Sequence, residues 1–226
     1  MSGFNESSYE NSIVELLESL GYTHLYGPDV KRDTHNPLYE EQLRSSLESI
    51  NPKLPAVAID EAIMKIKEYE AGSLVSKNEI FTDYIQNGVT VSFQKNGEEV
   101  SEIVRLVDYD SPAKNSFIVA NQWTYEEYET KRPDVVIFLN GMPVVVMELK
   151  SPKADSVTID DAYQQIQNYK KSIESFFIYN AFCVISDQSQ TKAGTITASI
   201  DRFMEWKTVD GDYEDTRFAD FTTLIK

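Results

Sequence analysis

The sequence predicts an α/β fold, in which a mixed β-sheet is flanked by helices and an additional helical segment occupies the N-terminal half. First, apolar residues recur at helical spacing before residue 88, whereas from Val89 onward they alternate with a period of two. Second, two β-branched runs, Val135 to Leu139 and Val144 to Met147, flank an Asn-Gly dipeptide, which is the strongest short-range hairpin signal. Third, the apolar run from Ala181 to Ser186 is typical of a central strand buried on both faces.

Composition bounds the domain organisation. The chain has 226 residues, of which 41% are apolar and 12% aromatic, enough for a large core. We expect one domain over 1–226, with a helical portion at about 30–87, a sheet-bearing core at about 5–25 and 88–209, and an acidic tail or linker at 210–226. One cysteine, Cys183, and two histidines exclude a disulfide framework and a zinc cluster, and we expect Cys183 to be an inert core thiol. The N-terminus is neither a signal peptide nor a spanning segment, so we expect a cytoplasmic protein without membrane contact.

The helices are predicted from their start and stop signals. Ser7-x-x-Glu10 reads as a capping box, followed by an apolar face that ends before Gly21. Three further helices are expected to open at Asn36-Pro37, at Pro55 and at a Ser76 cap, the last ending at Gly88. A helix that begins near Asp160-Asp161 carries a buried stripe through Tyr169.

The strands follow from alternation and turn chemistry. Asn96-Gly97 is expected to turn a strand from Val89 into one reaching Leu106. The remaining expectations are a strand at Phe117 to Ala120, a strand-end turn or cleft border at Asn121-Gln122-Trp123, a solvated loop at Tyr125 to Glu129, and a last strand at Gly194 to Ile200 above Trp206.

Charged residues gather at one end of the apolar hairpin. Asp134 opens its first strand, and Glu148 and Lys150 close its second, two residues apart and therefore on one face. Carboxylates supply the hard oxygen ligands that suit Mg²⁺. A neighbouring lysine can orient a metal-bound water or stabilise negative charge on a phosphodiester. The alternative is a structural ion pair in which Lys150 neutralises Glu148; the surrounding motifs favour the metal site.

A shared metal requires Asp134 and Glu148 to lie on the same face of the hairpin. With a strict two-residue turn at Asn140-Gly141 and an unbroken ladder, Asp134 would oppose Met147 and point away from Glu148. A three-residue loop ending at Gly141, or a β-bulge elsewhere in the hairpin, restores the shared face. We therefore predict an odd loop or a bulge.

These motifs, in this order, resemble a known family. Pro133-Asp134 followed after thirteen residues by Glu148-Leu149-Lys150 looks like the PD-(D/E)xK nuclease motif, and the string from Arg132 to Pro152 is similar to the restriction (R) subunit of type I restriction-modification enzymes. Gln165-x-x-x-Tyr169 matches the extra motif of the RecB-like branch. Asp108 to Pro112 and Asn121 to Trp123 also resemble the N-terminal region of those subunits, so the likeness covers about 7–210.

The resemblance implies a fold, an activity and site residues. The fold would be the PD-(D/E)xK restriction-endonuclease-like sheet, and the activity that of a Mg²⁺-dependent type I site-specific deoxyribonuclease. Asp134, Glu148, Lys150, Gln165 and Tyr169 would be catalytic, with the metal held by Asp134 and Glu148. An acidic residue of the first helix lies near the metal in that family, and Glu10 is the best match; its other possible role is to cap the helix at Ser7.

The net charge of −16 argues against an autonomous DNA binder, because phosphate contacts dominate nucleic-acid affinity. The resemblance implies that an ATP-driven motor on the same polypeptide presents duplex DNA, and that methyltransferase and specificity subunits complete the complex. The chain has no P-loop motif, so ATP would serve the full-length protein only, of which we expect this to be an N-terminal fragment. The alternatives are a catalytically silent domain that docks the motor on the methyltransferase core, and another RecB-like DNA repair nuclease.

Overall fold

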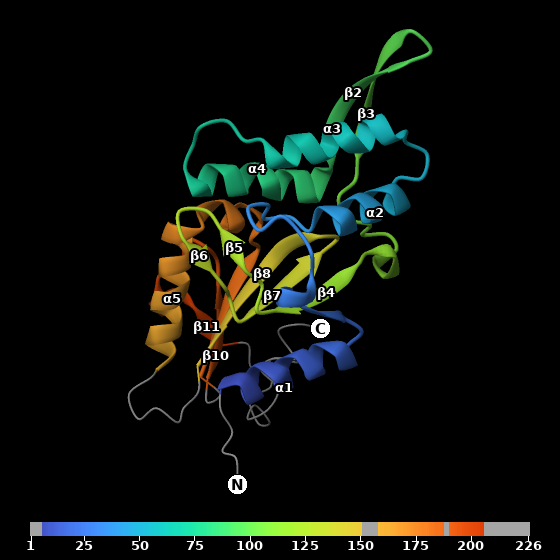
Figure 1. The fold of residues 1–226 in the computed structure, drawn as a ribbon. Helices are drawn as coiled ribbons and strands as arrows, with labels where there is room; N and C mark the ends of the chain where they lie inside the picture. The colour runs from blue at the N-terminus through green and yellow to red at the C-terminus, as the bar shows by residue number, and fades with distance from the viewer. Residues whose placement is uncertain (1–5, 151–157, 188–189, 206–226) are drawn as a thin grey trace.

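The centre of the molecule is a seven-stranded mixed β-sheet (Figure 1). The computed structural model describes residues 6–150, 158–187 and 190–205. Strands β1 and β4, and strands β8 and β9, pair in parallel, whereas the other neighbours are antiparallel. In spatial order the strands are β1 (Thr23–Tyr26), β4 (Phe117–Asn121), β7 (Val135–Leu139), β8 (Met142–Leu149), β9 (Phe182–Ser186), β10 (Thr191–Gly194) and β11 (Met204–Glu205). The predicted α/β class with a mixed sheet is confirmed.

Helices cover both faces of the sheet. Helix α1 (Glu6–Ser19) packs its apolar stripe on one face, where Leu17 is fully buried together with Val119 and Met147. Helix α5 (Ile159–Ser172) packs on the opposite face, where Ile166 joins Val136 and Val146. A short 3₁₀ helix, η3 (Glu174–Tyr179), continues from α5 and is buried along most of its length. Each strand of the central hairpin is therefore apolar on both sides, as continuous Val and Ile runs require.

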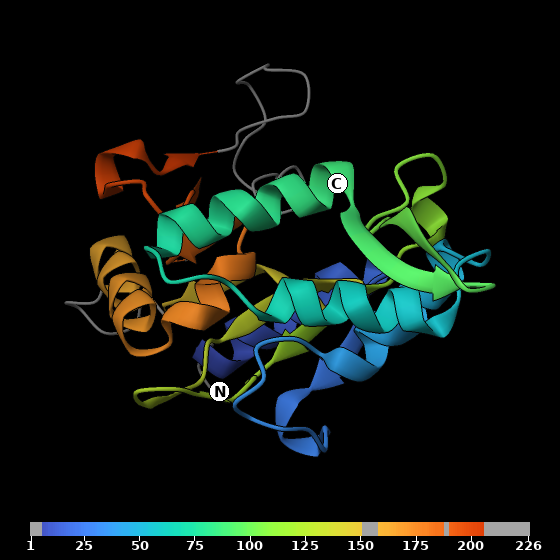
Figure 2. The ribbon, with the colours of Figure 1, turned by 90° about the horizontal axis from the view of Figure 1, so that it is seen from above.

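The remaining helices form what we call the helical annex: α2 (Glu40–Ile50), α3 (Ala56–Lys67), α4 (Leu74–Asn87) and the hairpin of β2 (Val89–Lys95) and β3 (Glu98–Val104). The annex lies across one end of the sheet, and the β2–β3 hairpin projects away from it (Figures 1 and 2). Pro55 caps α3 and Gly88, at φ +79°, ends α4, as expected. Asn96-Gly97 makes the predicted turn between β2 and β3.

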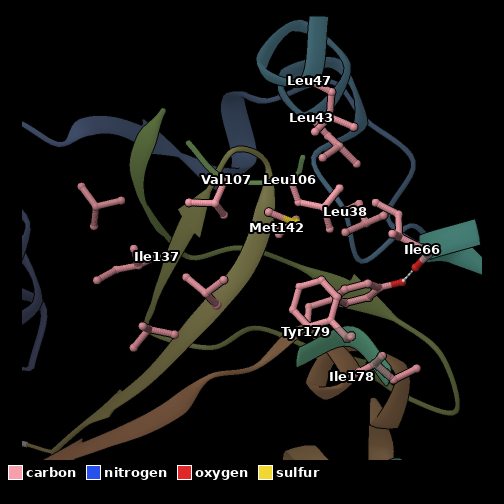
Figure 3. Close-up of a cluster of buried hydrophobic side chains, with 14 of the residues drawn as sticks. Leu38, Leu43, Leu47, Ile66, Leu106, Val107, Ile137, Met142, Ile178 and Tyr179 are labelled. Carbon is pink, nitrogen blue, oxygen red and sulfur yellow. Dashed lines mark hydrogen bonds between the residues drawn. The ribbon is translucent and has the colours of Figure 1, made fainter. Parts of the chain in front are cut away.

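The annex and the sheet share one hydrophobic core. Leu43 and Leu47 of α2 point toward Met142 of the central hairpin in Figure 3. The Tyr179 hydroxyl of η3 donates a hydrogen bond to the Ile66 carbonyl oxygen of α3 at 2.9 Å, drawn as the dashed line in Figure 3. Tight packing across this boundary fixes the end of the hairpin, because a close-packed core transmits small displacements.

The turn of the central hairpin is buried against the annex. Asn140 and Gly141 both have positive φ, and Asn140 is fully buried. The Asn140 side chain accepts from the Ser116 amide at 2.7 Å and donates to the Leu106 carbonyl oxygen at 2.9 Å. The Gly141 carbonyl oxygen accepts from the Tyr39 amide at 2.8 Å. The Asn-Gly pair is thus both a turn and an anchor.

Two helix starts differ from prediction. Helix α2 begins at Glu40 rather than at Asn36-Pro37, because the Asn36 side chain makes a turn of its own by accepting from the Leu38 amide. Helix α4 is capped by Ser73 rather than Ser76: Ser73 is extended, and its hydroxyl oxygen accepts the Ser76 amide at 3.2 Å. The predicted cap is therefore the residue whose amide is capped.

Three expectations for β-structure are wrong. Strand β3 ends at Val104, before Leu106. The solvated loop expected at Tyr125 to Glu129 is wrong for Tyr125, which is 2% exposed because β5 (Tyr125–Glu126) pairs with β6 (Thr130–Lys131) and its ring packs against Phe176. Glu127 to Glu129 are exposed, as expected. The strand expected at Gly194 to Ile200 lies earlier, as β10, because Thr191 pairs with Ser186 of β9. Trp206 and the tail at 210–226 lie outside the described residues.

Two remaining expectations concern the single cysteine and membrane-spanning helices. Cys183 is buried in β9, and burial raises the pKa of its thiol to about 12, in agreement with the expected inert core residue. No helix within the described residues is long and apolar enough to cross a membrane.

Candidate active site

A β-bulge brings the acidic ends of the central hairpin onto one face. The turn at Asn140-Gly141 is a two-residue turn, with Leu139 opposite Met142 and Phe138 opposite Pro143. Ile137 then pairs with Val145, so Val144 is the extra residue of β8. Its neighbour Val145 packs in the same hydrophobic cluster, as expected where alternation is interrupted. Of the two predicted solutions, the bulge is the one found.

The bulge restores the parity that a shared site needs. Val135 pairs with Met147, and continuing this register places Asp134 opposite Glu148. Directly opposed residues share a face of the sheet. That face is the one covered by α5, because Val136 and Val146, two residues from Asp134 and Glu148 respectively, both belong to the cluster under that helix. The predicted convergence of the two carboxylates is confirmed at the level of the backbone.

The three charged residues of the hairpin are held by specific contacts. Asp134 Oδ2 accepts the Leu149 amide at 2.8 Å, across the end of the ladder. Glu148 is 2% exposed, and its Oε1 forms an ion pair with Lys150 Nζ. The Lys150 amide donates to the Ser186 carbonyl oxygen of β9 at 2.8 Å, which continues the parallel pairing beyond the last residue of β8. Lys150 is thereby fixed at its backbone and at its ammonium.

Helix α5 carries Tyr169 to the carboxylates. Its N-terminus is a capping box, in which Thr158 is the cap and Asp161 returns its carboxylate to the Thr158 amide. Burial raises the pKa of the Tyr169 phenol well above its usual range, and the negative charge of Glu148 adds to the effect, whereas a hydrogen bond with Gln165 opposes it. The Tyr169 hydroxyl also makes a long 3.5 Å contact with the Arg132 carbonyl oxygen. The structure therefore groups Tyr169 and Gln165 with the acidic pair.

Glu10 approaches from helix α1. Ser7 lies inside α1, so the interpretation of Glu10 as the partner of a Ser7 cap is wrong. The Glu10 carboxylate is buried and accepts two amide hydrogen bonds, from Asn121 Nδ2 at 2.7 Å and from Gln122 Nε2 at 2.6 Å. Asn121 in turn accepts from His24 Nε2 at 2.8 Å. This polar chain links α1, β1 and β4, so Glu10 is positioned by tertiary contacts rather than by helix capping.

Gln122 adopts an uncommon backbone conformation at the end of β4. Its φ is +55°, in the left-handed region that non-glycine residues seldom occupy. Its amide donates to the Asp134 carbonyl oxygen at 3.1 Å. Gly27 lies so close that a Cβ there would be 2.5 Å from the Gln122 carbonyl oxygen. The backbone beside Asp134 is therefore held in a conformation that surrounding contacts determine, as is common at functional sites.

A polar cleft of about 570 Å³ opens beside Asp134. Glu10, Asn121, Gln122 and Asp134 line its inner part. Of the two alternatives for Asn121 to Trp123, a strand-end turn or a cleft border, Asn121 and Gln122 fit the cleft border, whereas Trp123 is buried beneath Tyr39 and Phe138. Exposed side chains complete the rim: Ser7, Asn11, Tyr26 and Arg132. Glu148, Lys150, Gln165 and Tyr169 do not line this cleft, so Asp134 is the residue common to the cleft and the acidic pair.

The donor set fits a hard, hydrated cation. Asp134 and Glu148 offer carboxylate oxygens on one face, and Mg²⁺ is typically held by one or two carboxylates together with water and substrate oxygens. Within the described residues, no group of three or more His, Cys, Asp or Glu side chains is placed to hold a metal. A cation at this position would therefore depend on water and substrate for the rest of its ligands.

The fold and the acidic hairpin define a class before any relative is considered. A mixed sheet with helices on both faces and a bulged hairpin that ends in Asp134, Glu148 and Lys150 is consistent with the fold of PD-(D/E)xK nucleases. Residues 3–202 match the family described as the type I restriction enzyme R protein N terminus, and the chain belongs to that family.

Named relatives agree with this assignment. The chain is 34% identical over 216 residues to the type I restriction enzyme HindI endonuclease subunit of Haemophilus influenzae, a match that covers 91% of the chain and 20% of that subunit. It is 30% identical over 213 residues to a putative type I restriction enzyme MjaIXP endonuclease subunit of Methanocaldococcus jannaschii, covering 90% and 20%. A type I restriction enzyme endonuclease subunit of Staphylococcus aureus is 28% identical over 192 residues, covering 83% and 19%. The chain spans about a fifth of the length of the curated relatives it matches.

Sequence patterns alone did not indicate two residues of the site. His24 belongs to β1, a strand that no pattern predicted, and it reaches Asn121 only because β1 and β4 are parallel neighbours. Arg132 lies in the string that carries the family resemblance, yet its place on the cleft rim depends on α1 and β1. The signal in the sequence that could have indicated Arg132 is its position, as a cation directly before Pro133-Asp134.

Proposed function

We propose that this chain is the Mg²⁺-dependent endonuclease domain of a type I restriction enzyme R subunit, which hydrolyses phosphodiester bonds of duplex DNA. The observation that carries the proposal is the Val144 bulge, which sets Asp134 opposite Glu148 with Lys150 on the Glu148 carboxylate. A structural ion pair between Glu148 and Lys150 alone would need no bulge, because those two residues share a face whatever the turn does. What the bulge changes is the position of Asp134, which it places on the same face as Glu148.

Asp134 and Glu148 would hold the metal through carboxylate oxygens. When bound, Mg²⁺ supplies a Lewis acid for the phosphoryl oxygens and makes a bound water more acidic. The Asp134 carboxylate is oriented by its hydrogen bond from the Leu149 amide, so one of its oxygens is fixed by the protein. Lys150 keeps its ammonium beside Glu148, where it can orient the attacking water or stabilise charge on the phosphate.

Gln165 and Tyr169 are proposed to support this group from α5. The pKa of Tyr169 is raised by burial and by Glu148, so the phenol keeps its proton and is available as a hydrogen-bond donor. A neutral donor next to two carboxylates can bind a phosphate oxygen or steady Lys150 without adding negative charge. Gln165 is half-buried one turn before Tyr169, and its side chain is hydrogen-bonded to the Tyr169 phenol.

We further propose that the DNA is delivered by an ATP-driven motor on the same polypeptide, within a complex that includes methyltransferase and specificity subunits. The net charge of −16 supports delivery, because a surface this acidic repels a polyanion at long range. ATP would act at the motor and not at this chain.

The test uses the full-length R subunit in its complex, with Mg²⁺ and ATP. Glu148→Ala and Lys150→Ala should abolish strand breaks while ATP hydrolysis continues, since neither residue belongs to the motor. Glu15→Ala, on the exposed face of α1, is the matched control and should cut like the wild type. Strand breaks that persist in Glu148→Ala would show that the assignment of Glu148 is wrong. Loss of ATP turnover in Lys150→Ala would instead indicate a structural role.

A further inference from the structure

The polar cleft beside Asp134 contains two carboxylates, those of Glu10 and Asp134, and a guanidinium, that of Arg132. Among the eight lining residues that belong to the described part of the chain, Arg132 is the one cation. Its side chain is exposed, and within 6–150, 158–187 and 190–205 its guanidinium makes no ion pair or hydrogen bond. On a chain of net charge −16 carboxylates outnumber basic side chains, so an exposed arginine without an ion pair to a described residue suggests a ligand from outside the chain.

The acidic residues inside the cleft are already provided with donors. Both oxygens of Glu10 accept amide hydrogen bonds, and Asp134 Oδ2 accepts the Leu149 amide. These contacts disperse the negative charge of the inner cleft. The rim presents mostly groups that can donate: the Arg132 guanidinium, the Asn11 amide and the hydroxyls of Ser7 and Tyr26. Such a rim suits an anionic ligand that lies across the opening.

Strand order sets the breadth of this rim. Tyr26 pairs with Asn121, and Asn121 pairs with Val135, so Tyr26 and Arg132 lie on opposite sides of β4. Neighbouring strands are about 4.8 Å apart, so Tyr26 and Val135, three residues after Arg132, are on the order of 10 Å apart across β4. The left-handed Gln122 and the close approach of Gly27 hold the strand end between them in place. The cleft thus extends on both sides of the end of β4, with Asp134 among the residues that line it.

We propose that this cleft binds the sugar-phosphate backbone of the strand being cut, with Arg132 on a phosphate next to the scissile one. A planar guanidinium can contact two phosphate oxygens at once, which fixes orientation as well as position. Asn11, Ser7 and Tyr26 add neutral hydrogen bonds further along the strand. The proposal rests on the proposed nuclease function, and it assigns Arg132 to substrate positioning rather than to metal binding.

The experiment measures DNA cleavage and ATP hydrolysis by the full-length subunit in its complex, over a series of salt concentrations. Arg132→Ala should slow cleavage about 10- to 100-fold, as expected for one lost charge-assisted contact, with ATP hydrolysis unchanged. Arg132→Lys should recover part of the rate, because it keeps the charge but not the two-pronged geometry. Arg105→Ala is the matched control: Arg105 is an exposed arginine paired with Asp110 near the β2–β3 hairpin, and this variant should cut at the wild-type rate.

The salt series separates a phosphate contact from a structural role. At subsaturating DNA the logarithm of the cleavage rate should fall less steeply with the logarithm of salt in Arg132→Ala, by roughly 0.9 per lost phosphate contact. Wild-type cleavage by Arg132→Ala, alongside inactive Glu148→Ala, would overturn the cleft assignment and leave the nuclease proposal standing. A slow Arg132→Ala with an unchanged salt slope would also overturn it. Full activity of Glu148→Ala would refute the nuclease proposal itself.

Discussion

Replacing Lys150 by Met removes the cation beside Glu148 while keeping most of the side-chain volume. The Glu148 side chain is 3% exposed and that of Lys150 is 20% exposed, so the pair lies between the buried and the surface cases. Breaking a buried pair costs about 3–5 kcal/mol, whereas an exposed pair contributes about 0–1 kcal/mol. We expect Lys150→Met to lower the free energy of unfolding by about 3 kcal/mol, or roughly 6–12 °C in Tm.

The reverse change should cost less. In Glu148→Gln the Lys150 ammonium can turn toward water, so we expect a loss of about 1 kcal/mol. The double variant, which has neither charge, should lose about 2 kcal/mol rather than the sum of about 4, a coupling of about 2 kcal/mol. Urea unfolding with a constant m-value measures all four proteins. The exposed pair of Lys67 and Glu40, at 2.8 Å, is the matched control and should couple by less than about 0.5 kcal/mol. Additivity at Lys150 and Glu148 would refute the reasoning that burial makes this pair interdependent.

Three further predictions concern the turn, acid stability and charge. Gly141→Ala should lower the free energy of unfolding by about 3 kcal/mol or more, because the added Cβ would lie 2.5 Å from the Tyr39 carbonyl oxygen. Gly97→Ala, at a similar φ but with no atom within 4 Å of the added Cβ, should lower it by only about 1 kcal/mol. Equal losses of Tm in the two variants would contradict this prediction. The Ser111 amide lowers the pKa of Asp108, so the stability that Asp108 adds is present above its unfolded pKa of about 3.9 and is lost as pH falls through the lower folded value. Asp108→Asn should accordingly be less stable than the wild type at neutral pH, with the gap closing only below about pH 4; a gap that persists at about pH 2 in acid unfolding would count against it. The isolated chain should bind duplex DNA more weakly than about 1 μM at physiological salt because of its charge, and tighter binding by fluorescence anisotropy would contradict that view.

The fold could be predicted where the signal is local. Asn140-Gly141 between β-branched runs indicated the central hairpin, and Pro55 and Gly88 indicated helix boundaries that the structure has. The alternation of side chains along a strand allowed a further prediction, because Asp134 and Glu148 can share a site only in a register that places both on one face. It predicted a bulge or an odd loop, but not which residue would bulge. Val144 is apolar like its neighbours, and nothing in its type distinguishes it.

The rest depends on which segments become neighbours. Tyr125 stands in an acidic stretch that looks solvated, and its burial follows from a contact with Phe176, fifty-one residues away in sequence. Glu10 sits three residues after a serine, which imitates a helix cap, whereas its actual partners are Asn121 and Gln122. The catalytic roles of Asp134, Glu148, Lys150, Gln165 and Tyr169, and the domain boundaries given above, stay predictions.

The Val144 bulge also constrains how the hairpin can change over generations. Inserting or deleting a single residue between Asp134 and Glu148 would turn one carboxylate to the far side of the sheet, unless a bulge were lost or gained in the same lineage. Changes of two residues keep both acids on one side. Among relatives that retain nuclease activity, the spacing between these acids should therefore vary by even steps, and an odd step should mark either a hairpin rebuilt without its bulge or a subunit that no longer cuts.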